Sequence, residues 1–266
     1  SSEWSEGELA KLFNMGAFPK IHIEVSLNEW KRLLEAYDFM KDYTYIHCDV
    51  DIELSGEEYS FNDAGLRIRG YSSRRRPEVR QYGDTHNADK TDWQQSSFML
   101  NLRKFQKDDA HELYNVRKIN LRHFFRDATC CRELFCYDLF RRFGIWTAPY
   151  SSYCRLWIHV KGDSKPAYFG VYGMVEAIDD KFIKRRKELF GDHDHNLWRC
   201  RWGATLNYND IKGAWISVDD DTGNDYVYEL KSNTDNFEAA KEQLYEFSKN
   251  LTQLEGQEFH DWIAKV

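Results

Sequence analysis

The sequence predicts an α+β fold, in which a mostly antiparallel sheet and several helices share a core. Short segments in which every second residue is apolar predict strands, mainly before residue 180. Segments with apolar residues three and four positions apart predict helices between these strands and near the end of the chain. Aromatic residues make up 16% of the 266 residues, which is enough to build a substantial core.

The first elements follow from local signals. Residues 19–26 alternate and predict a strand. Ser26 and Glu29 have the spacing of a capping box, so a helix is expected to begin there. Residues 45–54 predict a second strand, which turns back into a short apolar segment at 59–61.

The segment Gly65–Gly70 predicts a strand that ends in a tight turn. Its two apolar residues point to one face, and Arg67 and Arg69 point to the other. Ser72 and Ser73 follow, so the turn offers open backbone N–H groups beside arginine, a combination that suits a phosphate. The alternative is a plain hairpin with a solvated basic face. The spacing of the glycines lacks the Lys-Ser/Thr pair of a P-loop.

A helix is predicted from Asp127, a good N-cap residue, to Gly144, a good C-terminal breaker. At helical spacing Arg132 falls within its apolar stripe and Glu133 at the edge of that stripe. A charged pair that enters a buried face needs partners, so Arg132 is expected to be buried and both residues are candidate site residues. The alternative is that Arg132 extends its charged end to solvent and Glu133 merely pairs with it. The stripe consists of Cys136, Leu139, Phe140 and Phe143.

The remaining elements complete the expected order. Strands are predicted at 98–102, 116–121, 153–160, 167–175 and 196–200, helices at 181–189, from 235 and from 259, and a hairpin between 215–218 and 226–230. Glu176 ends the strand 167–175. Helix, strand, strand and acidic linker is also the order of the upper lobe of a protein kinase, although fold analogy alone does not fix function.

Composition excludes several classes of function. The net charge of -7 argues against extensive nucleic-acid binding. No apolar run approaches the roughly 20 residues needed to span a bilayer. The six cysteines contain no CxxC pair and are predicted to be free thiols. No metal site is predicted, because His193, His195 and Cys200 lack a fourth ligand and Asp219–Asp225 resembles a calcium loop in composition only.

Several motifs occur in a defined order along the chain. They are Gly65–Ser73, Arg132-Glu133 with Leu139–Gly144, Arg155–Ile158, Tyr168–Tyr172 with Glu176–Asp179, Asn196–Trp198 and, more loosely, Tyr228–Asn233. This ordered set is similar to the CotH (spore coat protein H) kinase family, over roughly residue 19 to the C-terminus. The family resembles an atypical protein kinase.

The resemblance implies a fold, a cofactor and a substrate. The expected fold is a kinase-like N-lobe followed by the start of a helical C-lobe. The expected activity of the parent protein is transferase activity, the phosphorylation of serine or threonine in Ser-rich secreted or coat proteins with ATP and Mg. The matching residues predicted to bind the nucleotide are Arg67, Arg69, Ser72, Ser73, Lys118, Arg132, Glu133 and Glu176. Glu133 matches the helix residue that pairs with a nucleotide-anchoring base, and Glu176 closes the hinge strand near the adenine.

Two departures from the family pattern limit the prediction. Gln94–Ser97 stands where family members commonly carry a lysine, so the anchoring base is Arg69, Arg103 or Lys118. The catalytic Asp, its companion Asn and the metal-binding Asp of the family lie beyond Val266, so no catalytic residue is predicted within this sequence. The chain is therefore expected to be inactive by itself, either as a truncated part of a longer kinase or as a degenerate member of the family.

The expected organisation has three parts. Residues 1–18 form an N-terminal extension, 19–180 the kinase-like N-lobe, and 181–266 the segment after the hinge and the start of the C-lobe. The resemblance implies a bacterial cell surface, secreted or spore-coat location, although a cytoplasmic one is not excluded. The alternative function is a non-catalytic surface module that binds protein or carbohydrate through its many aromatic residues.

Overall fold

The structure is a computed structural model that describes residues 6–41, 44–79, 86–190, 195–218 and 226–266. His193 and the predicted hairpin tip 219–225 lie outside the described residues. The chain divides into two compact units, Ser1–Ile178 and Asp179–Val266. We describe each unit separately.

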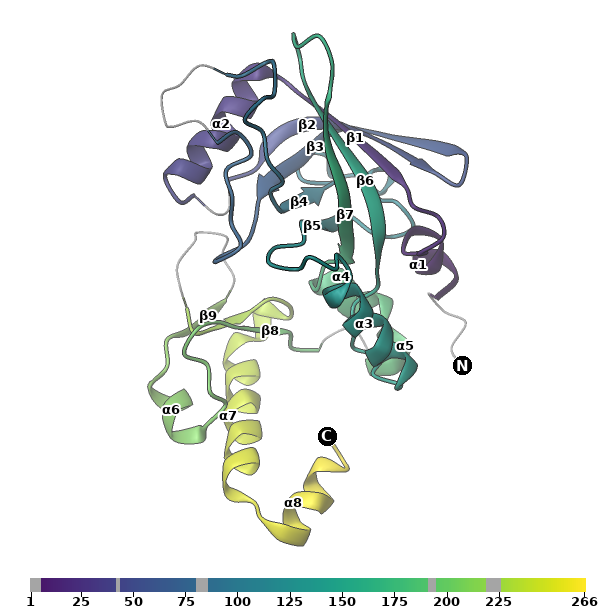
Figure 1. Ribbon diagram of the computed structural model, residues 1–266. Helices are drawn as coiled ribbons and strands as arrows, with labels where there is room; N and C mark the ends of the chain where they lie inside the picture. The colour runs from purple at the N-terminus through teal and green to yellow at the C-terminus, as the bar shows by residue number, and fades with distance from the viewer. Residues whose placement is uncertain (1–5, 42–43, 80–85, 191–194, 219–225) are drawn as a thin grey trace. The chain divides into compact units, whose positions relative to one another are not determined.

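The first unit is built on a closed seven-stranded barrel (Figure 1). Around the barrel the strand order is β1-β2-β3-β4-β5-β7-β6, and β6 returns to pair with β1. This last pair is parallel, and the other neighbours are antiparallel. The strands are β1 (Lys20–Val25), β2 (Ile46–Leu54), β3 (Glu57–Ile68), β4 (Phe98–Asn101), β5 (Lys118–Arg122), β6 (Ser151–Val160) and β7 (Ala167–Glu176). The predicted α+β class is confirmed, and the sheet closes on itself rather than staying open.

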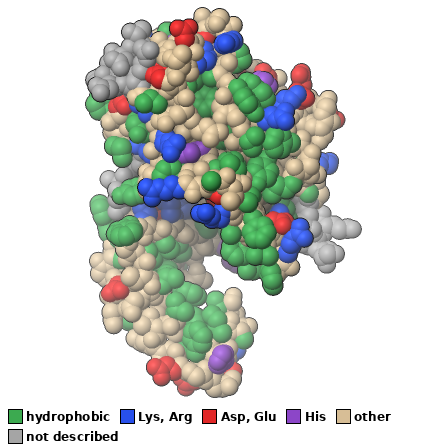
Figure 2. All heavy atoms as spheres, viewed as in Figure 1, with side chains coloured by type: hydrophobic (Ala, Val, Ile, Leu, Met, Phe, Trp, Pro, Cys, Tyr) green, Lys and Arg blue, Asp and Glu red, His purple; other side chains and the backbone are tan. Residues whose placement is uncertain are grey.

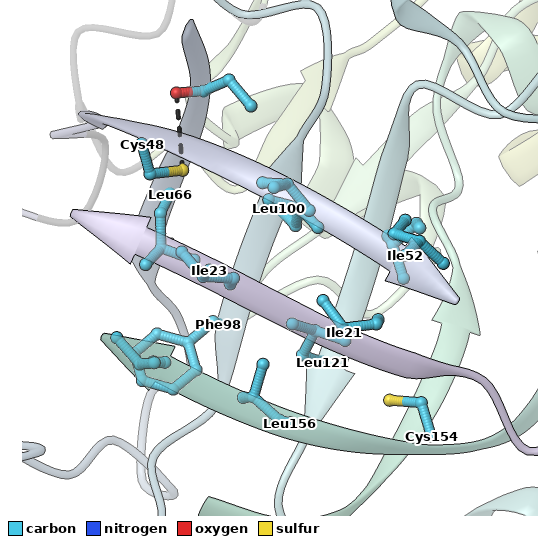
Figure 3. Packing of buried hydrophobic residues seen from close by; sticks show 14 of the residues in the cluster. Ile21, Ile23, Cys48, Ile52, Leu66, Phe98, Leu100, Leu121, Cys154 and Leu156 are labelled. Atoms are coloured by element: carbon cyan, nitrogen blue, oxygen red, sulfur yellow. Dashed lines mark hydrogen bonds between the residues drawn. The ribbon is translucent and has the colours of Figure 1, made fainter. Parts of the chain in front are cut away.

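The barrel interior is the main hydrophobic core (Figure 3). Alternate residues of each strand point inward, as the sequence pattern predicts, so that Ile21 of β1, Leu66 of β3 and Leu156 of β6 are fully buried. Cys48 also points inward and donates its thiol to the carbonyl of Ala64, 3.5 Å away. The strands β3 and β5 therefore each have an apolar face toward the barrel interior and a polar face on the outside.

Helices pack on the outside of the barrel. The helix α2 (Leu27–Asp38) begins as predicted, since Ser26 accepts a hydrogen bond from the Glu29 backbone N–H at 3.2 Å. The Glu29 carboxylate does not close the capping box but accepts the His47 backbone N–H at 2.8 Å. The segment expected to be an extension contains α1 (Glu6–Leu12), whose Leu9 and Leu12 belong to the core. The first unit also contains η1 (Asp109–His111) and α3 (Arg132–Arg142).

A buried polar network holds the segment after the Arg67–Arg69 strand against α2. The Glu78 side chain is 1% exposed and accepts hydrogen bonds from Trp30 Nε1 at 2.6 Å and the Asn87 backbone N–H at 3.2 Å. His86 connects Glu78 to Asp163 in the turn between β6 and β7, with ring-nitrogen distances of 2.5 and 3.0 Å to the two carboxylates. Glu78 thus serves donors from two separate segments of the chain, α2 and residues 86–87.

The second unit combines a small sheet with helices. Its sheet has the order β8-β10-β9, with β10 antiparallel to β8 and parallel to β9. The predicted hairpin between 215–218 and 226–230 is therefore wrong, because its two arms pair in parallel. The elements are α4 (Asp180–Arg185), α5 (Lys187–Phe190), β8 (Trp198–Cys200), α6 (Tyr208–Gly213), β9 (Ile216–Val218), β10 (Tyr228–Leu230), η2 (Thr234–Asn236), α7 (Phe237–Gln253) and α8 (Gly256–Ile263). None of the helices in the described residues is long and apolar enough to span a membrane.

Candidate functional site

Basic residues gather on the outer face of the barrel where β3, β4 and β5 lie side by side. Arg67 and Arg69 lie on this face because the intervening Ile68 points into the core. Asn120 and Arg122 of β5 lie on it for the same reason, since Leu121 points inward. The Arg69 guanidinium donates a hydrogen bond to the Asn120 side-chain oxygen, which joins the two strands.

The charges around Arg69 repel one another. Burial lowers the pKa of Arg69 to about 10, and the nearby cations Arg122 and Arg67 add to this effect. The carboxylate of Glu133 acts in the opposite direction, but each of the two arginines has a larger effect. The charges of Arg67 and Arg122 thus act on Arg69, and an anion bound near these guanidinium groups would relieve their repulsion.

The helix α3 brings Glu133 to this group. It begins at Arg132 rather than at Asp127, because the Asp127 carboxylate reaches forward and accepts the Arg132 backbone N–H at 2.9 Å. A hydrogen bond from the Thr129 hydroxyl, followed by the one from Arg132, lowers the pKa of Asp127, so the carboxylate stays charged at the positive helix end.

The predicted buried face of this helix is wrong. The Arg132 side chain is 70% exposed and lies 4.0 Å from Asp127, so it extends into solvent instead of entering the core. Phe140 and Phe143 are exposed too, and Leu134 is the buried residue of α3. The reason is Gly173 of β7, where a Cβ atom would lie only 2.9 Å from Leu134 Cδ1. The absent side chain leaves room for Leu134, and this contact sets the rotation of the helix.

Glu133 forms an ion pair with Arg122. The Arg122 Nε atom donates to one Glu133 carboxylate oxygen, and the Tyr137 hydroxyl donates to the other, each at 3.3 Å. Burial, and then the Glu133 charge, raise the pKa of Tyr137, so the phenol keeps the proton that it donates. Sequence reasoning missed Arg122 because the predicted strand stopped at residue 121. Extending the alternation by one position would have placed it beside Lys118 and Asn120.

The other predicted site residues fall into separate groups. Lys118 lies on the same face of β5 as Arg122, whereas Arg103 pairs with Glu112 at 2.9 Å. Glu176 is 1% exposed at the end of β7, and its carboxylate accepts the Tyr150 backbone N–H at 3.1 Å. Its backbone carbonyl accepts a hydrogen bond from Asn120 at 3.3 Å. This bond connects Glu176 to the outer surface that carries Arg67, Arg69 and Arg122, which we call the arginine face.

The turn with Ser72 and Ser73 begins directly after Arg69. Gly70 has a φ of +112°, and a Cβ atom there would lie 2.7 Å from Ser73 Oγ, so the turn requires glycine. The Arg69 backbone N–H donates to the Ser97 carbonyl at 2.9 Å, which ties the start of the turn to the strand entering β4. Among the described residues, no cluster of His, Cys, Asp and Glu is suited to a metal ion, and all six cysteines are free.

His123 lies next to Arg122 and is 7% exposed. Burial lowers its pKa to about 4, and the charges of Arg75 and Arg122 contribute to the shift. His123 is therefore neutral at physiological pH while it lies in a positively charged environment.

This shift predicts a loss of stability in acid. Below the ordinary pKa of 6.5, the unfolded chain takes up a proton at His123 that the folded chain binds only near pH 4. Stability attributable to His123 is thus fully present above pH 6.5 and falls by at most about 3 kcal/mol as the pH drops to 4. Urea unfolding at several pH values measures this slope. The His123→Gln variant should lose that part of the slope, and an unchanged slope would contradict the assignment.

Comparison with known proteins identifies the family of the chain. Searches among curated proteins and among solved structures gave no match. The model of the family described as CotH kinase protein matches residues 66–266, which include the arginine face, α3 and the whole second unit. The chain therefore belongs to the CotH kinase protein family.

Proposed function

We propose that the barrel unit binds the phosphates of ATP as the nucleotide-binding part of a CotH-type protein kinase. The supporting observation is the ion pair between Arg122 of β5 and Glu133 of α3, beside the repelling guanidinium of Arg69. Phosphoryl transfer depends mainly on holding the phosphates in place, and a base fixed by a helix glutamate serves that purpose. In this proposal Arg122 and Arg69 hold the phosphates, while Glu133 orients Arg122.

The order of elements supports a kinase-like N-lobe. The strands β3, β4 and β5 are followed by α3 and then by the hairpin of β6 and β7, and the ion pair joins the third of these strands to the helix. Glu176 ends β7 at the position of the hinge in this comparison. The closed barrel differs from an open N-lobe sheet, so the analogy concerns the site and the segment from β3 to β7.

The activity is proposed from family membership. It is the transfer of phosphate from ATP, with Mg, to serine or threonine of a Ser-rich protein at the cell surface or in a spore coat. Within the described residues, the arginine face supplies positive charge to the phosphates, and the proposal assigns no proton transfer to it.

ATP titration by calorimetry tests the binding proposal. Arg122→Gln should weaken ATP binding at least about tenfold, because it removes a charge-assisted contact. Glu133→Gln should weaken it less, since the guanidinium stays but loses its orientation. Arg142→Gln is the matched control, because Arg142 lies on the same helix and pairs with Asp138 on the far side from β5.

Adenosine and tripolyphosphate identify the part of ATP that the site recognises. Tripolyphosphate should compete with ATP, and the Arg122→Gln change should not alter adenosine binding. Equal ATP affinity in the wild-type protein and in Arg122→Gln would overturn the proposal.

Exposed aromatic side chains favour the alternative of a binding module. Phe135 of α3 is 62% exposed and Phe143, directly after this helix, is 77% exposed. Figure 2 shows hydrophobic side chains gathered where Figure 1 draws α3. Exposed apolar surface of this kind is typical of protein contact sites. If the protein binds neither ATP nor tripolyphosphate, this alternative becomes the better explanation.

A further inference from the structure

A buried histidine nitrogen beside the arginine face lacks a hydrogen-bond partner. Within the described part of the chain, no acceptor or donor lies within hydrogen-bond distance of His123 Nε2. The other ring nitrogen, Nδ1, lies 2.7 Å from the Ser97 hydroxyl oxygen. A buried polar atom without a partner costs stability, so its retention needs an explanation.

The hydrogen bonds of Ser97 indicate which ring nitrogen carries the proton. Ser97 Oγ accepts the backbone N–H of His123 at 3.2 Å. If the hydroxyl also donates to Nδ1, both groups are satisfied and the proton of the neutral ring is on Nε2. The other tautomer would leave the Ser97 hydroxyl proton without an acceptor as well as leaving Nε2 unpaired. The tautomer with hydrogen on Nε2 therefore has the lower cost, and the unpaired atom is a donor.

The surroundings of this donor are positive. Arg75 and Arg122 both act on His123 electrostatically. The Phe125 ring stands edge-on to the imidazole at 5.9 Å, and the guanidinium of the exposed Arg75 lies 5.4 Å from the centre of that ring. An N–H donor near two cations suits an anionic acceptor, because an anion can accept its hydrogen bond and also balance the positive charge.

We propose that His123 is a phosphate-binding residue, whose Nε2–H donates to an oxygen of the bound nucleotide's phosphates, near the charges of Arg122 and Arg75. This inference rests on the proposed nucleotide binding and adds a neutral donor to the arginine face. Ser97 is a positioning residue that keeps the proton on Nε2. Because Nε2 is buried, a neighbouring side chain must move to admit the phosphate oxygen.

Two substitutions at His123 separate the donor from the packing. His123→Gln places an amide N–H2 near the position of Nε2, whereas His123→Asn reaches only as far as Nδ1. We expect His123→Asn to weaken ATP binding about tenfold in calorimetry and His123→Gln to restore most of it. His22→Asn is the control, since His22 stacks on Trp157 elsewhere on the barrel. Thermal unfolding confirms that each variant is folded.

NMR of ¹⁵N-histidine-labelled protein gives an independent measurement. The free protein should show His123 with hydrogen on Nε2, and Ser97→Ala should shift it toward a mixture of tautomers. Sulfate, which does not titrate in the range used, should move the Nε2 resonance in the wild-type protein.

The outcomes separate this inference from the proposed function. If ATP binds equally to the wild-type protein, His123→Asn and His123→Gln, His123 is not a ligand residue, although nucleotide binding stands. If ATP does not bind but sulfate moves the Nε2 resonance, nucleotide binding falls and the anion donor stands. The inference is overturned if His123 in the free protein carries its hydrogen on Nδ1. It is also overturned if neither ATP nor sulfate moves the Nε2 resonance.

Discussion

The Glu78→Ala variant is expected to lose about 3–5 kcal/mol of unfolding free energy, because it removes the acceptor of a buried network. The change would leave Trp30 Nε1, the Asn87 backbone N–H and His86 without their shared carboxylate. Each stranded donor costs its own desolvation, and water cannot reach a site that is 1% exposed. Urea unfolding monitored by tryptophan fluorescence measures the loss directly, since Trp30 stacks on Trp93 at 4.9 Å.

A matched substitution controls for the loss of a carboxylate. Glu58→Ala makes the same change on the exposed part of β3 and should alter stability by less than about 0.5 kcal/mol. If both variants unfold at the same urea concentration, the network does not carry the stability assigned to it.

The second large effect concerns the contact that seats α3. Leu134→Ala should destabilise the first unit by about 2–5 kcal/mol, because Leu134 is 1% exposed and is the buried residue of the helix. Gly173→Ala should cost about 1–3 kcal/mol, since the new methyl group would lie 2.9 Å from Leu134 Cδ1.

Combining the two changes tests whether they act through one contact. In the double variant the alanine at position 134 no longer meets the new methyl group, so the total loss should be smaller than the sum. Denaturant unfolding of the four proteins gives the coupling energy. Strict additivity would show that Gly173 is not what positions the helix.

Much of the fold could be predicted because strand signals are local. The alternation of residues 19–26 and 45–54 identified β1 and β2, and the Ser26 cap identified the start of α2. The same alternation placed Arg67 and Arg69 on the outer face. Closure of the sheet could not be predicted, since the pairing of β1 with β6 depends on segments far apart in the sequence.

The errors at α3 have one physical cause. Helical periodicity selected the stripe richest in apolar residues, but Phe140 and Phe143 are exposed and Leu134 is buried. The packing direction depends on a glycine in β7, about 40 residues later, which no local pattern around the helix reveals. The predicted burial of Arg132 was wrong for the same reason, because its side chain is exposed. Glu133, by contrast, lies beside the arginine face and pairs with Arg122.

The family match begins at residue 66, within β3, although the barrel begins much earlier. The strands β1 and β2 and most of β3 precede that residue, as do the core residues of α1 and α2. A fragment starting there would leave strands with unpaired edges, which favour association with other chains.

Closure between β1 and β6 also sets an order of events during synthesis. Glu24 and His159, whose side chains lie 3.2 Å apart on these strands, are separated by 135 positions. The strand β1 therefore leaves the ribosome long before its parallel neighbour β6 has been made. One edge of β1 stays unpaired until then. Contacts of such long sequence separation form slowly, because the intervening chain must be ordered first. The barrel thus completes its folding only after the hairpin of β6 and β7 has emerged, and until then β1 keeps an unpaired edge that can mispair.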